Sequence, residues 1–222
     1  MLKALFYKEW IKTRKVINLI TLLLGSIVIY SFLDITRIIR IDGAVDAWTS
    51  VILNDIILIP TLKYIPLVSG LLLGFSQYVP EMINKRLKLT LHLPWSENKI
   101  ILSHLLYGFL VLLFLFLVSY LMLLGIVRYY FAWELMATTF WASIPWLAGG
   151  FAAYLLSAWV SLEPNWKQRA FNTLIAGTAL SLFYLEGKQG SFSSIIYYLL
   201  IAILLFIAFS FFSATRFKEG EQ

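Results

Sequence analysis

Long apolar runs alternate with short charged connections along the chain. The stretches without Asp, Glu, Lys or Arg are 16 to 28 residues long and cover 16–33, 64–80, 100–127, 135–162, 170–185 and 189–215. A helix rises about 1.5 Å per residue and a bilayer core is about 30 Å thick, so these runs suit membrane-spanning helices. The pattern predicts an all-α integral membrane protein in which residues 1–222 form a single transmembrane domain.

The apolar runs predict six transmembrane helices, at 16–33, 56–79, 100–127, 135–162, 168–185 and 192–214. The second helix begins before its charge-free run, because Lys63 lies near one end and can extend its amine toward the membrane interface. The fifth run is the shortest. Its helix can extend back to Trp166 with Lys167 and Arg169 among the headgroups, and the alternative is a re-entrant hairpin with the sixth run.

Composition agrees with a membrane protein. Hydrophobic residues make up 60% of the chain and charged residues 14%, whereas soluble domains have about 45–50% apolar and about 25% charged residues. The absence of cysteine excludes disulfides, thiolate catalysis and cysteine metal sites. The formal net charge of +6 is typical of the cytoplasmic loops of a membrane protein, and we expect no nucleic-acid partner.

The distribution of Lys and Arg predicts the orientation. If both termini are cytoplasmic, thirteen of these residues lie on the inner side and four on the outer side, with Lys63 unassigned. The positive-inside rule therefore predicts a multi-pass protein of the plasma (inner) membrane with two cytoplasmic termini. The first apolar run lacks a small-residue cleavage site, so no signal peptide is expected.

The predicted outer connections are short, and the longest, 34–55, contains one amphipathic stretch. Residues 45–53, with Trp48 among them, suit a helix lying in the outer interface. An irregular loop is the alternative.

The basic N-terminal segment, 1–15, is predicted to form an interfacial helix. On a helical wheel Trp10 belongs to the apolar side, while Lys8 and Lys12 lie on another side. Glu9 projects along the apolar side, where a carboxylate is costly unless a cation or donor meets it. A contact with a partner is the hypothesis for Glu9, and a simple basic topology anchor is the alternative for the whole segment.

The connection between the second and third predicted spans contains a short helix and a tight corner. Pro80 suits a first helical turn, and Glu81 complements the dipole of that helix. Pro94 ends the helix, and Ser96 suits the cap of the next one. The apolar side of this helix consists of Leu87, Leu91 and Leu93. These leucines need burial, which favours docking in a groove of another protein.

These features together resemble the type-2 permeases of ATP-binding-cassette transporters. The resemblance rests on Glu81, the leucine-rich stretch 87–93, the Leu-Pro-Trp-Ser corner at 93–96 and the Ile pair at 100–101. The opening 5–10 and the ending 211–221 also resemble those of the family. The chain departs from the family in having Lys85-Arg86 where a Gly-Thr pair is usual, and His104 where a Lys is common.

The resemblance implies an exporter permease driven by separate cytoplasmic ATPase subunits. The implied ATPase contact consists of Glu81, Lys85, Arg86, Leu87, Leu91, Leu93 and Pro94. A smaller cytoplasmic contact involves Glu163, Lys167 and Arg169, for which a solvated, topology-setting turn is the alternative. The expected partners are these ATPases, a second permease chain in a homodimer or heterodimer, and membrane lipids.

No enzyme activity is expected of this chain. It lacks the Gly-x-x-x-x-Gly-Lys-Ser/Thr loop, so ATP and Mg²⁺ would bind to the ATPase partner, and no cofactor is expected here. His92 and His104 lack metal-ligand spacing. The aromatic content of 17% favours a hydrophobic, lipid-like or peptide substrate. The alternative functions are a non-transporting membrane assembly or interaction subunit and a secondary transporter.

Overall fold

The computed structural model describes residues 2–41, 43–53, 57–83, 90, 96–185 and 196–219. Within these ranges the regular elements are helices and no strand is present. The α-helices are α1 (Leu2–Ile41), α2 (Ala44–Ile52), α3 (Ile65–Ile83), α5 (Glu97–Tyr130), α6 (Trp133–Leu162), α7 (Trp166–Ser181) and α8 (Ile196–Glu219). Two 3₁₀ turns, η1 (Pro60–Leu62) and η2 (Leu182–Tyr184), precede α3 and follow α7. The predicted all-α class is confirmed.

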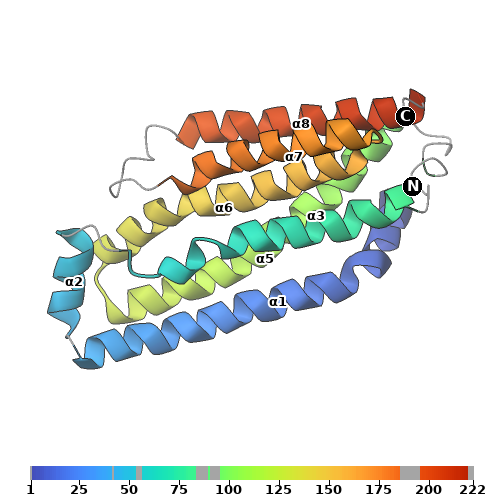
Figure 1. Cartoon of the computed structure of the whole chain (residues 1–222). Helices are drawn as coiled ribbons and strands as arrows, with labels where there is room; N and C mark the ends of the chain where they lie inside the picture. The colour runs from blue at the N-terminus through green and yellow to red at the C-terminus, as the bar shows by residue number, and fades with distance from the viewer. Residues whose placement is uncertain are drawn as a thin grey trace.

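The long helices lie side by side along one axis (Figure 1). The start of α1 and the end of α8 meet at one end of the bundle, which we call the terminal end. The short helix α2 lies across the opposite end, which we call the far end. Short connections make consecutive helices antiparallel, so the chain returns to the terminal end after α3, α6 and α8.

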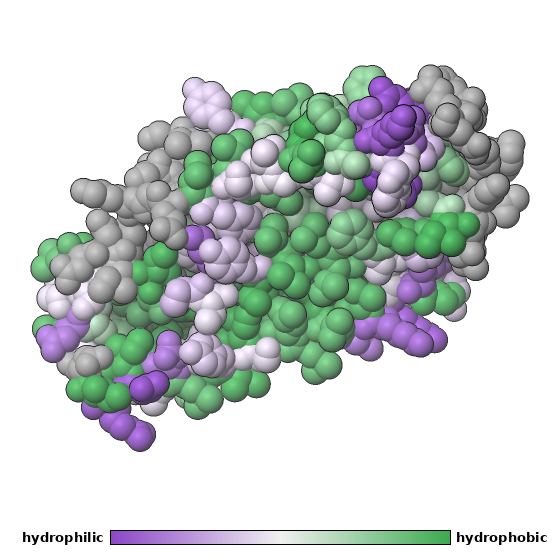
Figure 2. All heavy atoms as spheres, viewed as in Figure 1, coloured by the Kyte–Doolittle hydropathy of each residue, from purple (hydrophilic) through white to green (hydrophobic). Residues whose placement is uncertain are grey.

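Four of the described helices are long and apolar enough to cross a membrane: α1, α5, α6 and residues 196–217 of α8. Figure 2 shows a hydrophobic middle band with hydrophilic side chains gathered toward the two ends of the bundle. This surface pattern and the four helices agree with a membrane protein. The first, third, fourth and sixth predicted spans therefore correspond to helices that are long and apolar enough to cross a membrane, and the number of six spans stays a prediction.

The second and fifth predicted spans correspond to shorter helices. α3 begins at Ile65 rather than near residue 56, because the chain first forms the turn η1, which has Pro60 at its start. α7 has 16 residues and begins at Trp166, as the extended version of the fifth helix predicted. Both helices pack along the others in the bundle, but they fall short of the length or hydropathy of a membrane span.

Two predicted helix boundaries are wrong. The segment 1–15 is not bounded as a separate helix, because α1 is continuous from Leu2 to Ile41, and its position at the membrane interface stays a prediction. Figure 1 shows α1 bending near its N-terminal end. In the first third of α1 the hydroxyl of Thr13 donates to the carbonyl oxygen of Glu9 at 2.8 Å, a kind of side-chain bond that often bends helices. Pro80 does not begin a new helix either. It lies inside the last turns of α3, which continues to Ile83.

The two alternatives for residues 45–53 are resolved in favour of a helix. α2 buries Ala47 and Val51 against the bundle and leaves Val45 exposed. Gly43 precedes α2 with φ of 87°, a left-handed conformation that glycine adopts without strain.

The tightest packing in the bundle joins α3 to α6 and depends on glycine. The spacing Gly70-x-x-x-Gly74 is typical of closely packed helices. A Cβ atom added to Gly70 would overlap the backbone carbonyl of Gly150, and one added to Gly74 would overlap the side chain of Ser157. The two backbones therefore approach each other closely.

We expect Gly70→Ala to destabilise the protein by about 1–3 kcal/mol, because the atoms it meets are backbone atoms that must shift. Gly125→Ala on α5 is the matched control, since a Cβ there meets no atom within 4 Å. Thermal unfolding in lipid nanodiscs measures both. Equal melting temperatures for the two variants would contradict the close α3–α6 contact.

Candidate functional site

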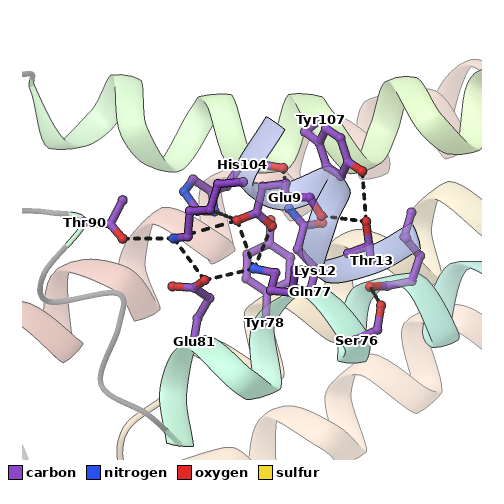
Figure 3. A network of polar contacts seen from close by, with 12 residues as sticks. Glu9, Lys12, Thr13, Ser76, Gln77, Tyr78, Glu81, Thr90, His104 and Tyr107 are labelled. Carbon is purple, nitrogen blue, oxygen red and sulfur yellow. Dashed lines mark hydrogen bonds and ion pairs between the residues drawn. The ribbon is translucent and has the colours of Figure 1, made fainter. Parts of the chain in front are cut away.

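Four charged side chains form a cluster at the terminal end of the bundle (Figure 3). We call Lys8, Glu9, Lys12 and Glu81 the ion cluster. The amine of Lys12 lies 2.7 Å from Oε2 of Glu9 and 2.9 Å from Oε1 of Glu81. The amine of Lys8 lies 3.0 Å from Oε1 of Glu81. The ion cluster thus joins the beginning of α1 to the end of α3.

Lys8 also reaches beyond the two helices. Its amine donates to the hydroxyl of Thr90 at 3.1 Å. Thr90 belongs to the connection between α3 and α5, in the part of the sequence that resembles a coupling helix. The side chain of Lys8 is therefore shared between Glu81 and this connection.

Helical spacing explains why three of the four groups meet. Lys8 and Lys12 are one turn apart on α1, and Glu9 pairs with Lys12 three residues later. These residues of α1 face the last turns of α3. Glu81 supplies the second carboxylate from there.

Both carboxylates are buried, with Glu9 and Glu81 each 1% exposed. A buried carboxylate without a cation costs several kcal/mol, and here two lysines offset two carboxylates. The lysines keep more contact with water, since the side chain of Lys8 is 37% exposed and that of Lys12 is 13% exposed. The charges therefore balance within the chain.

The two carboxyl groups have different proton affinities. They lie outside the charge-free parts of their helices, since the first begins at Val16 and the second ends at Pro80. Burial raises the pKa of Glu9, and Lys12 only partly opposes this effect. Burial also acts on Glu81, but Lys12 and Lys8 together outweigh it and lower its pKa. Glu81 is therefore the more firmly ionised of the two.

A buried polar layer continues from the ion cluster toward the middle of the bundle. Nδ1 of His104 on α5 lies 3.5 Å from Oε1 of Glu9. The amide of Gln77 donates to the backbone oxygen of His104 at 2.9 Å. The hydroxyl of Tyr154 on α6 donates to Oε1 of Gln77 at 2.9 Å and lies 3.2 Å from that of Tyr78.

The polar layer joins α3, α5 and α6 on the side of the ion cluster that faces the middle of the bundle. Tyr154 is fully buried, and it fits because Gly108 on α5 has no side chain. A Cβ at Gly108 would overlap the Tyr154 ring. A parallel link joins α1 to α5, where the hydroxyls of Thr13 and Tyr107 lie 2.9 Å apart.

The contacts of the ion cluster are ion pairs and hydrogen bonds. Among the described residues no group of three His, Asp or Glu side chains is arranged to hold a metal ion. The lysine amines occupy the space between the two carboxylates (Figure 3). The ion pairs therefore join α1 to α3, and Lys8 adds a hydrogen bond to the connection at Thr90.

The structure unites residues that the sequence assigned to two surfaces. Lys8, Glu9 and Lys12 were predicted on an interfacial helix, and Glu81 in an ATPase contact, yet all four belong to the ion cluster. The sequence suggested that Glu9 contacts a partner protein, but the cation that pairs with it is Lys12 of its own helix. Its burial therefore requires no second protein. Trp10 stands apart from the cluster as an exposed side chain.

The remaining residues of the predicted ATPase contact lie outside the described part of the chain. These residues are Lys85, Arg86, Leu87, Leu91, Leu93 and Pro94. Their role stays a prediction from the sequence. Ser96 occupies the predicted N-cap position of α5, although its side chain forms no cap hydrogen bond there.

The second predicted cytoplasmic contact is divided between the inside and the outside of the bundle. The carboxylate of Glu163 is buried, with Oε2 accepting from the hydroxyl of Ser213 at 2.6 Å and Oε1 lying 3.8 Å from Arg216. Arg169 donates through Nε and Nη2 to the backbone oxygen of Glu163 at 3.1 and 2.6 Å. Lys167 is exposed. Glu163 therefore joins α6 to α8, and only the basic residues are open to contact.

Comparisons with known protein families, curated proteins and solved structures give no match for this chain. The resemblance to type-2 permeases therefore stays a prediction from the sequence.

We expect Lys12→Met to destabilise the bundle by about 3–5 kcal/mol, because it leaves two buried carboxylates with only Lys8 beside them. Lys15→Met is the matched control, since Lys15 is exposed three residues further along α1. Unfolding in lipid nanodiscs measures the difference. A Lys12 variant as stable as the control would show that the ion cluster does not hold α1 to α3.

We expect Glu81→Gln to lower stability more than Glu9→Gln, with a loss on the order of 3 kcal/mol at Glu81. The reason is that two lysines favour the ionised form of Glu81, whereas burial disfavours that of Glu9. The same unfolding measurement at neutral pH compares them. The reverse order would refute the assigned difference between the two carboxyl groups.

Proposed function

We propose that the chain is the permease subunit of an ATP-binding-cassette exporter, driven by a separate cytoplasmic ATPase. The observation that carries the proposal is the double role of Lys8, which contacts both Glu81 and Thr90. These two residues lie in the stretch that resembles a coupling helix. A displacement of this stretch by an ATPase would act directly on α1 through one charged side chain.

The orientation proposed for the chain places the terminal end in the cytoplasm. The basic beginning of α1 lies at this end, as do Lys167, Arg169 and Arg216 at helix ends. The positive-inside rule favours the cytoplasm for such an end. An ATPase would then meet the same end of the bundle that holds the ion cluster.

A hydrophobic, lipid-like or peptide substrate is supported by an apolar groove of about 630 Å³ between α5, α6 and α8. Its walls include Leu105, Phe109, Phe151, Leu155 and Ile203. Ligand pockets commonly have volumes of about 300–1,000 Å³. A groove with these walls offers an apolar molecule the environment that it prefers.

The test of the proposal is the identity of the proteins that purify with the chain. A tagged full-length chain is extracted from the membranes of its native cell in mild detergent. We expect a cytoplasmic ATPase with a phosphate-binding loop to co-purify with it. Mass spectrometry identifies the partner. Transport by the chain alone under an ion gradient would instead favour a secondary transporter, and neither ATPase nor transport would favour an assembly subunit.

Leu91→Asp tests the coupling contact within that complex. We expect it to weaken binding of the ATPase about tenfold to a hundredfold, since a buried leucine contact contributes about 1.5–3 kcal/mol. Leu53→Asp is the matched control, because Leu53 is exposed at the far end. Co-purified ATPase per permease is the measurement. Charge changes at Glu81 are unsuitable, because they disturb the ion cluster. Wild-type binding by the Leu91 variant would refute the contact.

A further inference from the structure

A second groove lies at the terminal end, apart from the ion cluster. It has a volume of about 450 Å³ and is formed by the end of α3, the beginning of α7 and the end of α8. Met82, Trp166 and Phe217 give it apolar walls, and Arg169 lies in its lining. We call it the Trp166 groove. Trp166 is 75% exposed and Ile83, also in the lining, is 74% exposed, so its rim is accessible.

Arg169 brings an uncompensated charge to this groove. Its guanidinium donates twice to the backbone oxygen of Glu163, which is a neutral acceptor. In the part of the chain that the structure describes, no carboxylate forms an ion pair with Arg169, and the carboxylate of Glu163 instead meets Ser213 and Arg216. A guanidinium has five N–H donors, so three remain for a ligand.

The bonds to Glu163 also fix the position of the charge. A guanidinium held on one edge presents its other donors as a planar fork, which suits two oxygens of one phosphate. The ring of Trp166 lies 5.9 Å from the guanidinium carbon and restricts it further. Exposed Lys167 adds positive charge in the same helical turn.

The groove lies at the level of the lipid headgroups, which indicates that the phosphate belongs to a lipid. Trp166 begins α7 at the end of the bundle where the apolar helices finish, and tryptophan prefers this headgroup level. Basic pockets between membrane helices bind anionic headgroups. The apolar walls would lie beside acyl chains, whereas a soluble anion would leave them without a partner.

We propose that the Trp166 groove binds an anionic phospholipid. The headgroup phosphate accepts hydrogen bonds from Arg169, Lys167 attracts the net negative charge, and the first part of an acyl chain lies against Met82 and Phe217. None of the residues of this site belongs to the ion cluster or to the segment 84–95, but Lys167 and Arg169 also belong to the predicted smaller cytoplasmic contact, so the test uses the purified chain without an ATPase.

The test compares phosphatidylglycerol with phosphatidylcholine on the purified full-length chain, using native mass spectrometry to count retained lipids. We expect about tenfold preferential retention of phosphatidylglycerol, because both lipids offer a phosphate but the choline cation of phosphatidylcholine cancels the net negative charge that attracts Arg169 and Lys167. Arg169→Gln should remove the preference. Arg128→Gln is the matched control, since Arg128 also donates to a backbone oxygen but lies at the far end.

A second variant separates lipid binding from folding, because Arg169 also supports the connection between α6 and α7. The double substitution Trp166→Ala with Lys167→Gln changes two exposed side chains and keeps both bonds to Glu163. It should reduce the preference while the melting temperature in phosphatidylcholine stays at the wild-type value. Equal retention of the two lipids by the wild type, or an undiminished preference in either groove variant, would overturn the proposal. Inorganic phosphate that competes as well as the lipid would assign the site to a soluble anion.

Discussion

The burial of carboxylates at one end of an apolar bundle is the constraint on which this structure depends. Glu9 and Glu81 are almost completely buried, and neither can be ionised there without a cation close by. Lys12 meets both, so the first turns of α1 must lie against the last turns of α3. The bend of α1 and the continuation of α3 past Pro80 both serve this contact, because either a straight α1 or a shorter α3 would separate the charges.

The sequence predicts the helices well where hydrophobicity alone decides. Charge-free runs place α5, α6 and the long helices at both ends of the chain, because a membrane core excludes ionised groups. The prediction of helix boundaries fails where a proline is compatible with more than one local structure. Pro80 was assigned to the first turn of a new helix, but it lies inside α3, which continues to Ile83. Pro60 lies in a turn that delays α3, which a count of apolar residues does not detect.

The sequence predicts only part of the site, because helical periodicity describes each helix by itself and not how two helices cross. Helical periodicity shows that Glu9 projects to an apolar side and needs a cation. It does not show that Lys12 turns inward with it, or that Glu81 completes the cluster, because that depends on how α1 crosses α3. Ser213 meets Glu163 across 50 residues of sequence, and no local pattern signals such a contact. Charged residues that sequence analysis assigned to outer surfaces therefore hold the bundle together.

The charged contacts also determine which parts of the bundle can move separately. α3 is tied to α1 by the ion cluster and to α6 by backbone contact at Gly70, and Glu163 ties α6 to α8. Opening a path between these helices within one chain would separate buried charges or close-packed backbones, and each costs several kcal/mol. In the proposed permease, a displacement at Thr90 would therefore act on these helices together. A substrate path, where the chain contributes to one, is then expected at the bundle surface, where the apolar groove of α5, α6 and α8 lies.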